Sequence, residues 1–333
     1  MSLMKAIVFD RIGDPRDVLR LAEVPKPVRS PGHILVKTSW ASINPGDGLF
    51  VQNLYPEPKK PKFPAQIAGN HGAGVVVEAA EGGTLLPGTR VAFSYVDVWA
   101  EYISMPEAWA IPVPDDYPLE KSAQMVNLVT ARDLLDMSGA APGEWIAVTA
   151  GNSTVSTMLA QMARAKDIHV LSIVRRRLAL PSGESAALGA SAVVELSSLD
   201  VPLGERIAEI TKGKGLRAAI DGVGGPMAGD LIRSLSFGGK FIVYGGFSQE
   251  RFSLHNFDIL MNGVRIEPYL YRYFFEPPKA EDRAWLEDIV RTTKPEAFRV
   301  RSAGAHAADD FASAVRESFE RPEAGKRFVA FGE

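Results

Sequence analysis

The sequence predicts an α/β protein with two domains, one β-rich and one built on a doubly wound parallel sheet. Three observations support this prediction. At 333 residues the chain exceeds what one typical hydrophobic core supports, so two domains of roughly 150 residues each are expected. The first ~120 residues contain short apolar runs separated by Pro and Gly, which are typical of strands and turns. After them, helical and strand-like patterns alternate, which favours parallel strands joined by helices.

The β-rich part is expected to contain five strands, at residues 5–9, 33–39, 72–78, 90–93 and 99–103. Turn-forming sequences such as Ser30-Pro31-Gly32 and Pro87-Gly88 separate these strands. The tail, which is expected to return to this domain, has helical patterns at 284–292 and 307–321 and ends in a strand pattern at 326–331. We therefore predict domain segments at 1–120, 121–265 and 266–333.

Residues 145–177 form the clearest strand–helix–strand unit. Trp145–Ala150 is a short apolar run, a polar turn follows, and apolar residues then recur at helical spacing through 155–162. Ile168–Val174 is a continuous apolar run, as expected for a parallel strand buried on both faces. Four further strand patterns follow, at 192–196, 216–221, 240–244 and 264–268, with helical patterns at 204–211 and 227–235 between the first three.

The same unit suggests a dinucleotide cofactor. In such units the first turn and the helix N-terminus bind a pyrophosphate, and the end of the second strand meets the adenosine ribose. An acid after this strand would favour a ribose with a free 2′-hydroxyl, whereas arginines favour a ribose with a 2′-phosphate. Three arginines follow the strand here, so the expected cofactor is NADP(H). The glycine fingerprint is incomplete, since only Gly151 is present and Thr154 and Ser156 stand where later glycines are expected. An ordinary crossover without a ligand therefore stays open.

Composition narrows the range of functions. The formal net charge is −3, with 37 Lys and Arg against 40 Asp and Glu, which gives no electrostatic case for nucleic acid or an anionic membrane as partner. The chain contains no cysteine, so thiolate zinc sites, disulfides and cysteine nucleophiles are excluded. No apolar run approaches the ~20 residues of a membrane span, and a cytoplasmic location is expected by default.

Several short stretches, in this order, resemble the medium-chain dehydrogenase/reductase superfamily over essentially the whole chain. They are Ser42–Asp47, Gly69–Val75, Pro87–Val91, Pro142–Trp145 and Tyr244–Gly246. The resemblance implies an alcohol dehydrogenase-like architecture, with a β-rich GroES-like catalytic domain and a Rossmann cofactor domain. It also implies a homodimer formed through the edge of the Rossmann sheet.

The resemblance favours the zinc-independent branches. Asn44 occupies the place of the first cysteine ligand of zinc-dependent alcohol dehydrogenases, although a broad family label could still name that type. His71 lies near the stretch that carries the metal-site histidine, but one histidine cannot build a tetrahedral zinc site. We expect His71 to be an ordinary hydrogen-bonded histidine, and we predict no metal site.

Two zinc-independent families resemble the chain, and both reduce activated double bonds. Quinone oxidoreductases have stretches similar to Asn44–Asp47 and Asn53–Pro56. Enoyl thioester reductases have stretches similar to Asn152–Ser156, Val174–Arg177 and Val223–Gly225, and they also share the Tyr-Gly-Gly loop. The second resemblance is stronger, so we predict an NADPH-dependent reductase of 2-enoyl thioesters, with a quinone oxidoreductase as the alternative. A superfamily member that binds cofactor or a partner without turnover is a further possibility.

The enoyl reductase resemblance also implies which residues hold the cofactor. Arg175 and Arg177 would clamp the 2′-phosphate, the turn from Asn152 would hold the pyrophosphate, and Thr130 would lie near the nicotinamide. The full predicted set is Thr130, Asn152, Ser153, Thr154, Val155, Ser156, Arg175, Arg177, Gly224, Tyr244, Gly245 and Gly246. The side chains of Thr154 and Ser156 are expected to weaken cofactor binding without abolishing it.

Tyr55 and Asn44 are the predicted catalytic residues. Gln52-Asn53-Leu54-Tyr55 resembles the stretch that carries the proposed proton donor of enoyl thioester reductases, and a phenol of pKa ~10 stays protonated at neutral pH. A packing tyrosine in a Tyr-Pro turn is the alternative. Asn44 could orient the substrate or cap the Asn-Pro turn.

The expected substrate is a small molecule, and a group of lysines and an aromatic run could contact it. Lys59, Lys60 and Lys62 could meet the phosphates of coenzyme A or an acyl carrier protein, or form an exposed polar loop. The aromatic run Tyr269–Phe275 is expected to form core and a cleft wall.

Overall fold

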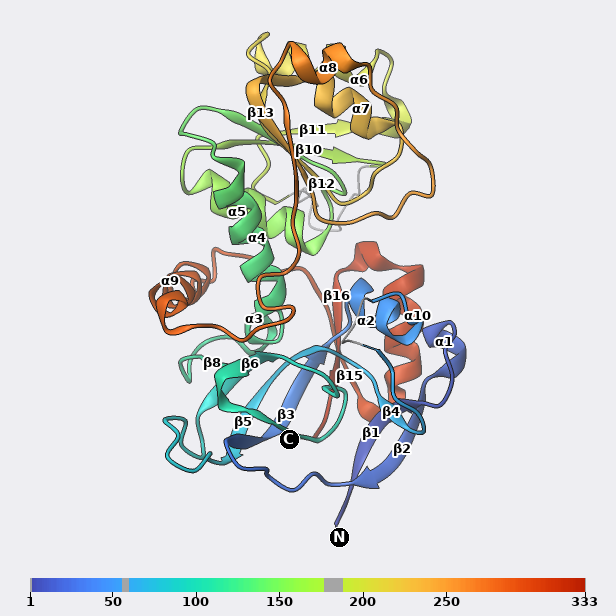
Figure 1. Ribbon diagram of the computed structural model, residues 1–333, viewed down its shortest axis with the longest axis vertical. Coiled ribbons are helices and arrows are strands. Elements are labelled where there is room, and N and C mark those ends of the chain that lie inside the picture. The colour runs from blue at the N-terminus through green and yellow to red at the C-terminus, as the bar shows by residue number, and fades with distance from the viewer. Residues whose placement is uncertain (1, 56–59, 177–187, 333) are drawn as a thin grey trace. The chain divides into compact units, whose positions relative to one another are not determined.

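The computed structural model describes residues 2–55, 60–176 and 188–332 of the chain (Figure 1). The chain forms two compact units. Unit 1 comprises Met1–Val126 and Tyr273–Glu333, and unit 2 comprises Asn127–Arg272. Within the described residues, no helix is both long and apolar enough to cross a membrane.

Unit 2 is built on a six-stranded sheet in which every neighbouring pair of strands is parallel. Its strands are β9 (Trp145–Val148), β10 (His169–Val174), β11 (Ala192–Glu195), β12 (Leu216–Asp221), β13 (Leu235–Val243) and β14 (Arg265–Pro268). The order across the sheet is β11-β10-β9-β12-β13-β14. Because the chain winds outward in both directions from β9 and β12, this is the doubly wound order, and the predicted fold class is confirmed. The switch point between β9 and β12 is where such sheets bind ligands, at the carboxyl ends of their strands.

The helices of unit 2 are α5 (Thr154–Arg164), α6 (Leu203–Thr211), α7 (Met227–Arg233), α8 (Asn256–Leu260) and the part of α4 (Met125–Ser138) that follows Val126. The apolar run of β10 is buried from Val170 to Val174, as a strand covered on both faces requires. Strand β13 begins at Leu235, five residues earlier than expected, because Leu235 already pairs with Leu216. The register then shifts before Lys240 pairs with Ala218, and Gly238 and Gly239 lie in this irregular stretch. Those glycines interrupt the apolar pattern and hide the start of the strand.

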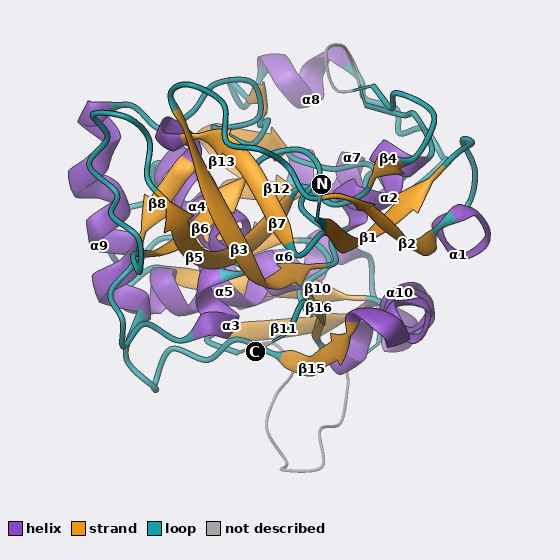
Figure 2. Ribbon diagram, turned by 90° about the horizontal axis from the view of Figure 1, so that it is seen from below, coloured by secondary structure: helices purple, strands orange, loops and turns teal. Residues whose placement is uncertain are grey.

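Unit 1 contains a three-stranded sheet, β2-β1-β4, and a seven-stranded sheet, β15-β16-β3-β5-β6-β8, in which β7 also pairs with β3. Figure 2 shows β3, β5, β6, β7 and β8 side by side. The strands of the two sheets in unit 1 are β1 (Leu3–Phe9), β2 (Arg20–Pro25), β3 (His33–Ser42), β4 (Gln66–Ile67), β5 (His71–Glu78), β6 (Arg90–Ser94), β7 (Tyr102–Pro106), β8 (Ala110–Pro112), β15 (Ser302–Ala307) and β16 (Lys326–Ala330). The edge strand β2 escaped prediction because its residues are half-exposed or exposed.

The helices of unit 1 are α1 (Pro15–Val18), α2 (Pro45–Val51), α3 (Leu119–Ser122), α9 (Arg283–Thr293) and α10 (Phe311–Glu320). Helix α10 starts later than the helical pattern from residue 307, because 302–307 form strand β15. The final strand β16 pairs antiparallel with β3, with Phe328 opposite Ser42. The tail therefore returns to the first domain, and its register carries Lys326 to the end of β3.

Candidate functional site

The turn between β9 and α5 passes close against strand β10. A Cβ on Gly151 would lie 2.7 Å from the Ser172 Cβ, so only glycine allows this approach. The N–H of Gly151 donates to the carbonyl of Ile173 at 2.9 Å. Ser153 is the N-cap of α5, and its hydroxyl accepts from the N–H of Ser156. The first N–H groups of the helix, at Thr154 and Val155, have no partner within the helix and can receive an anion.

Ser156, at the place of the third glycine, is accommodated by hydrogen bonds. Its side chain is 2% exposed, and its hydroxyl donates to the carbonyl of Thr149 at 3.0 Å and accepts from the Ser153 hydroxyl at 3.0 Å. The phenol of Tyr244, just after β13, is hydrogen-bonded to the same two serines, and burial raises its pKa. Ser153, Ser156 and Tyr244 thus form one polar network at the N-terminus of α5.

The loop after β12 is held by a buried acid. Asp221, 1% exposed, accepts from the Thr149 hydroxyl at 2.7 Å and from the N–H groups of Val223 and Gly224 at 2.9 and 3.0 Å. The Thr149 hydroxyl in turn accepts from the N–H of Gly222 at 2.9 Å. Sequence reasoning missed Asp221 and Thr149. An acid at the end of an apolar strand was the available signal for Asp221.

The remaining cofactor candidates of unit 2 have distinct places. Arg175 and Arg176 are exposed directly after β10, and the Asn152 amide donates to the Arg176 carbonyl at 3.2 Å. Arg177 lies outside the described residues. A Cβ on Gly245 would lie 2.7 Å from the Gly222 carbonyl oxygen, so the loops after β12 and β13 touch, while Gly246 next to it is exposed.

Thr130 reaches the same end of the sheet through Tyr269. Thr130 is 8% exposed on α4 and is hydrogen-bonded to the Tyr269 phenol. The Tyr269 phenol donates to Asp133 at 3.1 Å, and the Tyr269 N–H donates to the carbonyl of Val243, the last residue of β13, at 2.8 Å. The structure therefore gathers the predicted cofactor residues that it describes at the carboxyl ends of β9, β10, β12 and β13.

In unit 1, a buried acid fixes the turn that starts α2. Asp47 is 2% exposed and accepts from the N–H of Asn44 at 2.7 Å and from the N–H and side-chain amide of Asn70, both at 2.9 Å. Burial raises the pKa of Asp47 to about 6, against the stabilising hydrogen bonds and the charge of Lys326. Burial lowers the pKa of Lys326 to about 8, and the charge of Asp47 opposes this shift.

The Asn44 amide is held at both ends. Its nitrogen donates to the Ser42 hydroxyl at 2.9 Å, and its oxygen accepts from the Lys326 ammonium at 2.9 Å. Lys326 also donates to the carbonyl of Ile43 at 3.1 Å. Asn44 thus connects β3, α2 and β16.

Tyr55 is half-buried beside this turn. Its hydroxyl lies against Gly46, since a Cβ there would be 2.1 Å from the phenol oxygen, and its ring packs edge-on against Phe274 with centroids 5.1 Å apart. Burial raises the pKa of Tyr55 above its ordinary value, and the negative charge of Asp47 adds to the shift. The phenol therefore keeps its proton at neutral pH, as a proton donor requires.

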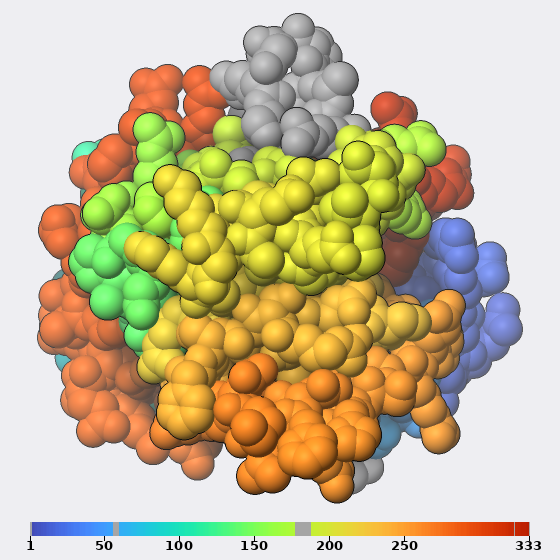
Figure 3. Space-filling view, turned by 90° about the horizontal axis from the view of Figure 1, so that it is seen from above, coloured from blue at the N-terminus to red at the C-terminus, as the bar shows by residue number. Residues whose placement is uncertain are grey.

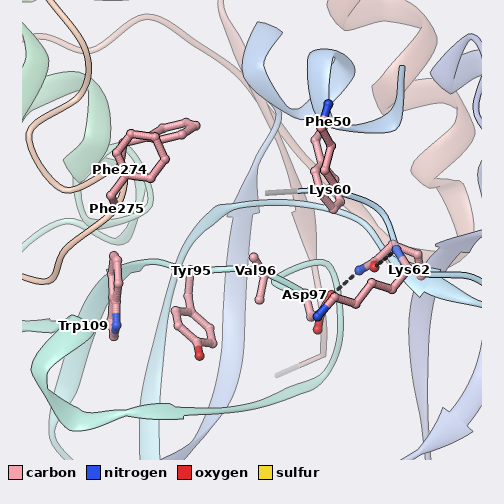
Figure 4. Close-up of a pocket in the computed structure, with 10 residues that line it drawn as sticks. Phe50, Lys60, Lys62, Tyr95, Val96, Asp97, Trp109, Phe274 and Phe275 are labelled. Atoms are coloured by element: carbon pink, nitrogen blue, oxygen red, sulfur yellow. Dashed lines mark hydrogen bonds between the residues drawn. The ribbon is translucent and has the colours of Figure 1, made fainter. Parts of the chain in front are cut away.

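A cavity of about 310 Å³ lies in unit 1 next to these residues (Figure 4). Five aromatic side chains line it, Phe50, Tyr95, Trp109, Phe274 and Phe275, together with Val96 and the polar residues Lys60, Lys62, Gln66 and Asp97. Phe274 contacts both the cavity and Tyr55. The aromatic run of the sequence is divided, because Tyr269 belongs to unit 2 and Phe274 and Phe275 to unit 1.

His71 is hydrogen-bonded through its ring Nδ1 to the Ser94 hydroxyl at 2.9 Å. Among the residues that the structure describes, no group of three His, Cys, Asp or Glu side chains could hold a metal ion. The polar groups around Asn44 are thus amides, hydroxyls, the Asp47 carboxylate and the Lys326 ammonium.

Two family models match the chain. The alcohol dehydrogenase GroES-like domain matches residues 30–115, and the zinc-binding dehydrogenase model matches residues 154–285. The mitochondrial enoyl-(acyl-carrier-protein) reductase of Bos taurus is 32% identical over 256 residues, which cover 75% of this chain and 67% of that protein. These matches confirm the predicted GroES-like domain and the resemblance to enoyl reductases.

Solved structures share the fold over nearly the whole chain. The complex of Etr1p with NADP and crotonyl-CoA gives a TM-score of 0.85 at 21% identity, covering 99% of this chain and 100% of that chain. A quinone oxidoreductase of Pseudomonas syringae pv. Tomato DC3000 gives a TM-score of 0.83 at 23% identity, covering 98% and 99%.

Proposed function

The chain belongs to the medium-chain dehydrogenase/reductase superfamily and is one of its reductases, and from this premise we propose its reaction. The protein reduces the C=C bond of α,β-unsaturated carbonyl compounds with NADPH and without zinc, and its substrates are 2-enoyl thioesters. The observation that carries this proposal is the half-buried Tyr55, whose pKa burial raises and whose ring packs against Phe274 in the wall of an aromatic cavity. The names of the enoyl reductase relatives supply the substrate class.

The residues at the carboxyl ends of the unit 2 strands fit NADP(H). The N-terminus of α5 would receive the pyrophosphate, and the close approach of Gly151 to β10 leaves this end of the helix open. Arg175, exposed at the end of β10, would pair with the 2′-phosphate. When bound, NADPH supplies a hydride to the substrate β-carbon.

Tyr55 would complete the reduction by giving its phenol proton to the α-carbon, so that one hydride and one proton saturate the double bond. Asn44 is a positioning residue in this scheme. Its amide joins Ser42 and Lys326 and so holds the turn on which the Tyr55 hydroxyl rests.

The proposal that the enzyme works without zinc rests on which side chains could bind the metal. The chain has no cysteine, and the Asn44 side chain that stands in place of a ligand is hydrogen-bonded to Ser42 and Lys326. Turnover should therefore be unchanged by a chelator and by added Zn²⁺. Loss of activity in the chelator, restored by Zn²⁺, would contradict this part of the proposal.

A quinone oxidoreductase is the second candidate. The aromatic walls of the unit 1 cavity suit a flat ring, and the Pseudomonas syringae neighbour is named as a quinone oxidoreductase. Turnover numbers with quinones and with 2-enoyl thioesters, measured side by side, separate the two candidates.

The direct test follows NADPH oxidation in the presence of crotonyl-CoA, longer 2-enoyl-CoAs and quinones. Tyr55→Phe should lower kcat by at least about 100-fold, as expected for loss of a general acid. Tyr117→Phe is the matched control, because Tyr117 is also a buried tyrosine of unit 1 but is hydrogen-bonded to Thr293. Unchanged turnover in Tyr55→Phe would remove Tyr55 from the mechanism.

Cofactor preference has its own test. Arg175→Ala should raise the KM for NADPH roughly 10- to 100-fold, the value of one or two charge-assisted hydrogen bonds, and leave the KM for NADH unchanged. Arg206→Ala is the control, since Arg206 is an arginine of the same unit paired with Asp200 and Glu209. Equal wild-type rates with NADH and NADPH would refute the role of Arg175.

The proposal includes a homodimer formed through the β14 edge of the unit 2 sheet. Strand β14 is the last strand of that sheet, and several apolar side chains around it are exposed, namely Phe257, Leu260, Met261, Ile266 and Leu270. The orange surface in Figure 3 belongs to this part of the chain. An unpaired edge with exposed apolar side chains favours association with a second copy.

Sedimentation velocity tests the dimer. Phe257→Glu combined with Leu260→Glu should shift the protein to monomer, whereas Leu86→Glu, an equally exposed leucine of unit 1, should not. A wild-type monomer at micromolar concentration would refute this part. The cytoplasmic location stays a prediction, which cell fractionation would test.

A further inference from the structure

The cavity of unit 1 has two chemically different sides. Figure 4 shows Trp109, Phe274 and Phe275 on one side and Asp97 with Lys62 on the other. On the aromatic side, Phe274 and Phe275 meet edge-on with centroids 4.6 Å apart, and Trp109 packs against Tyr95 at 5.5 Å. A plain alkyl chain would need only apolar walls. The polar side therefore indicates a ligand that carries a polar group.

Asp97 is the defining residue of the polar side. One carboxylate oxygen of Asp97 accepts from the side-chain amide nitrogen of Gln66 at 2.6 Å. The side-chain amide oxygen of Gln66 accepts from the backbone N–H of Lys62 at 2.8 Å. Over the described part of the chain, the second carboxylate oxygen has no hydrogen-bond partner. Asp97 also adopts the left-handed backbone region, with φ of 61°, which aspartate tolerates better than most residues with a side chain.

The charges around Asp97 select the kind of ligand group. A carboxylate only accepts hydrogen bonds, so the ligand must present a donor to the second oxygen. Lys62 lies close enough for its positive charge to act on Asp97, and Lys60 also lines the cavity, so the two ammonium groups outnumber the one carboxylate. A neutral hydroxyl fits better than an ammonium, because it can donate to Asp97 without facing the charge of Lys62.

We propose that the cavity selects substrates whose unsaturated acyl group ends in a hydroxylated aromatic ring, such as a 4-hydroxycinnamoyl thioester. The ring would lie among the aromatic side chains and its hydroxyl would donate to Asp97. Phe274 joins this cavity to Tyr55, so the double bond of such a substrate lies on the Tyr55 side of the ring. This inference rests on the proposed function, because it names the acyl group for the same reaction.

Substrate selectivity tests the proposal. The ratio of kcat/KM for 4-hydroxycinnamoyl-CoA to that for cinnamoyl-CoA should be about 10 or more, the value of a hydrogen bond to a charged acceptor. Asp97→Asn and Asp97→Gly should both bring this ratio towards 1, since Asn and Gly tolerate the left-handed backbone of this position. Asp115→Asn, an exposed aspartate of the same unit that does not line the cavity, should keep the wild-type ratio.

A binding measurement separates failure of this inference from failure of the proposed function. Calorimetry would compare 3-(4-hydroxyphenyl)propanoyl-CoA with 3-phenylpropanoyl-CoA, and the hydroxylated compound should bind about tenfold more tightly. Binding preference without turnover would overturn the proposed reaction and support the selectivity of the cavity. Turnover without preference, or equal ratios in wild type and both Asp97 variants, would overturn the present inference and leave the proposed reaction standing.

Discussion

Replacing Lys326 by methionine tests its pairing with Asp47 at the turn that starts α2. The Lys326 ammonium donates to Asn44 and Ile43, and its charge acts on Asp47. Methionine keeps an apolar stem of similar length but removes the ammonium, so Asp47 loses its opposite charge. The variant should therefore be destabilised in a way that depends on pH.

The size of the effect follows from the pKa of Asp47, which burial raises from 3.8 to about 6. A raised carboxyl pKa stabilises the fold at low pH, and this contribution, about 3 kcal/mol, is lost as pH rises from 3.8 through 6. In the wild type the loss ends near pH 6. Without Lys326 the pKa of Asp47 moves higher, so the loss continues above pH 6 at up to about 1.4 kcal/mol per pH unit, and the variant loses more stability than the wild type by pH 7.5.

Urea unfolding at pH 5.5 and 7.5, followed by tryptophan fluorescence, measures this difference. Trp40, Trp99, Trp109 and Trp285, four of the five tryptophans, belong to the same unit as Lys326. The pH range stays below the Lys326 pKa of about 8, so most of Lys326 keeps its proton. Lys5→Met is the control, because it breaks only an exposed pair with Asp309. If Lys326→Met and wild type lose the same stability between the two pH values, the coupling of Lys326 to Asp47 is refuted.

Three further substitutions test single elements of the structure. Asp221→Ala should cost about 2–4 kcal/mol in urea unfolding followed by circular dichroism, because it leaves the buried Thr149 hydroxyl and two half-buried N–H groups without an acceptor; a cost under about 1 kcal/mol would contradict this. Ser156→Gly should change the Kd for NADPH in calorimetry by less than about threefold, since the hydroxyl donates to the Thr149 carbonyl; tenfold tighter binding would show that the side chain obstructs the cofactor. Lys121→Met should lower the free energy of unfolding by about 1–3 kcal/mol, because the Lys121 ammonium caps three carbonyls at the end of α9, beginning with Thr293, and an unchanged urea midpoint would contradict this.

Local sequence patterns determined most of unit 2. A continuous apolar run such as 168–174 is typical of a strand covered on both faces, and its alternation with helical patterns favours a parallel sheet. The turn from Asn152 to Ser156 was predictable for the same reason, since strand, turn and helix follow one another within a few residues. Tyr55 was identified through the resemblance of its short stretch, and its pKa and packing are consistent with the proposed role.

Only the tertiary structure decided which distant residues meet. Lys326 reaches Asn44 because β16 pairs antiparallel with β3 in a register that places Phe328 opposite Ser42, two residues from each partner. No local periodicity encodes that register, because it depends on how both strands pack into one sheet. Asp97 and Gln66 likewise join across 31 positions to form the polar side of the cavity. The sequence by itself determined the elements and the turn that fits a dinucleotide; the pairing of remote strands and loops decided the buried Asp47–Lys326 pair and the shape of the cavity.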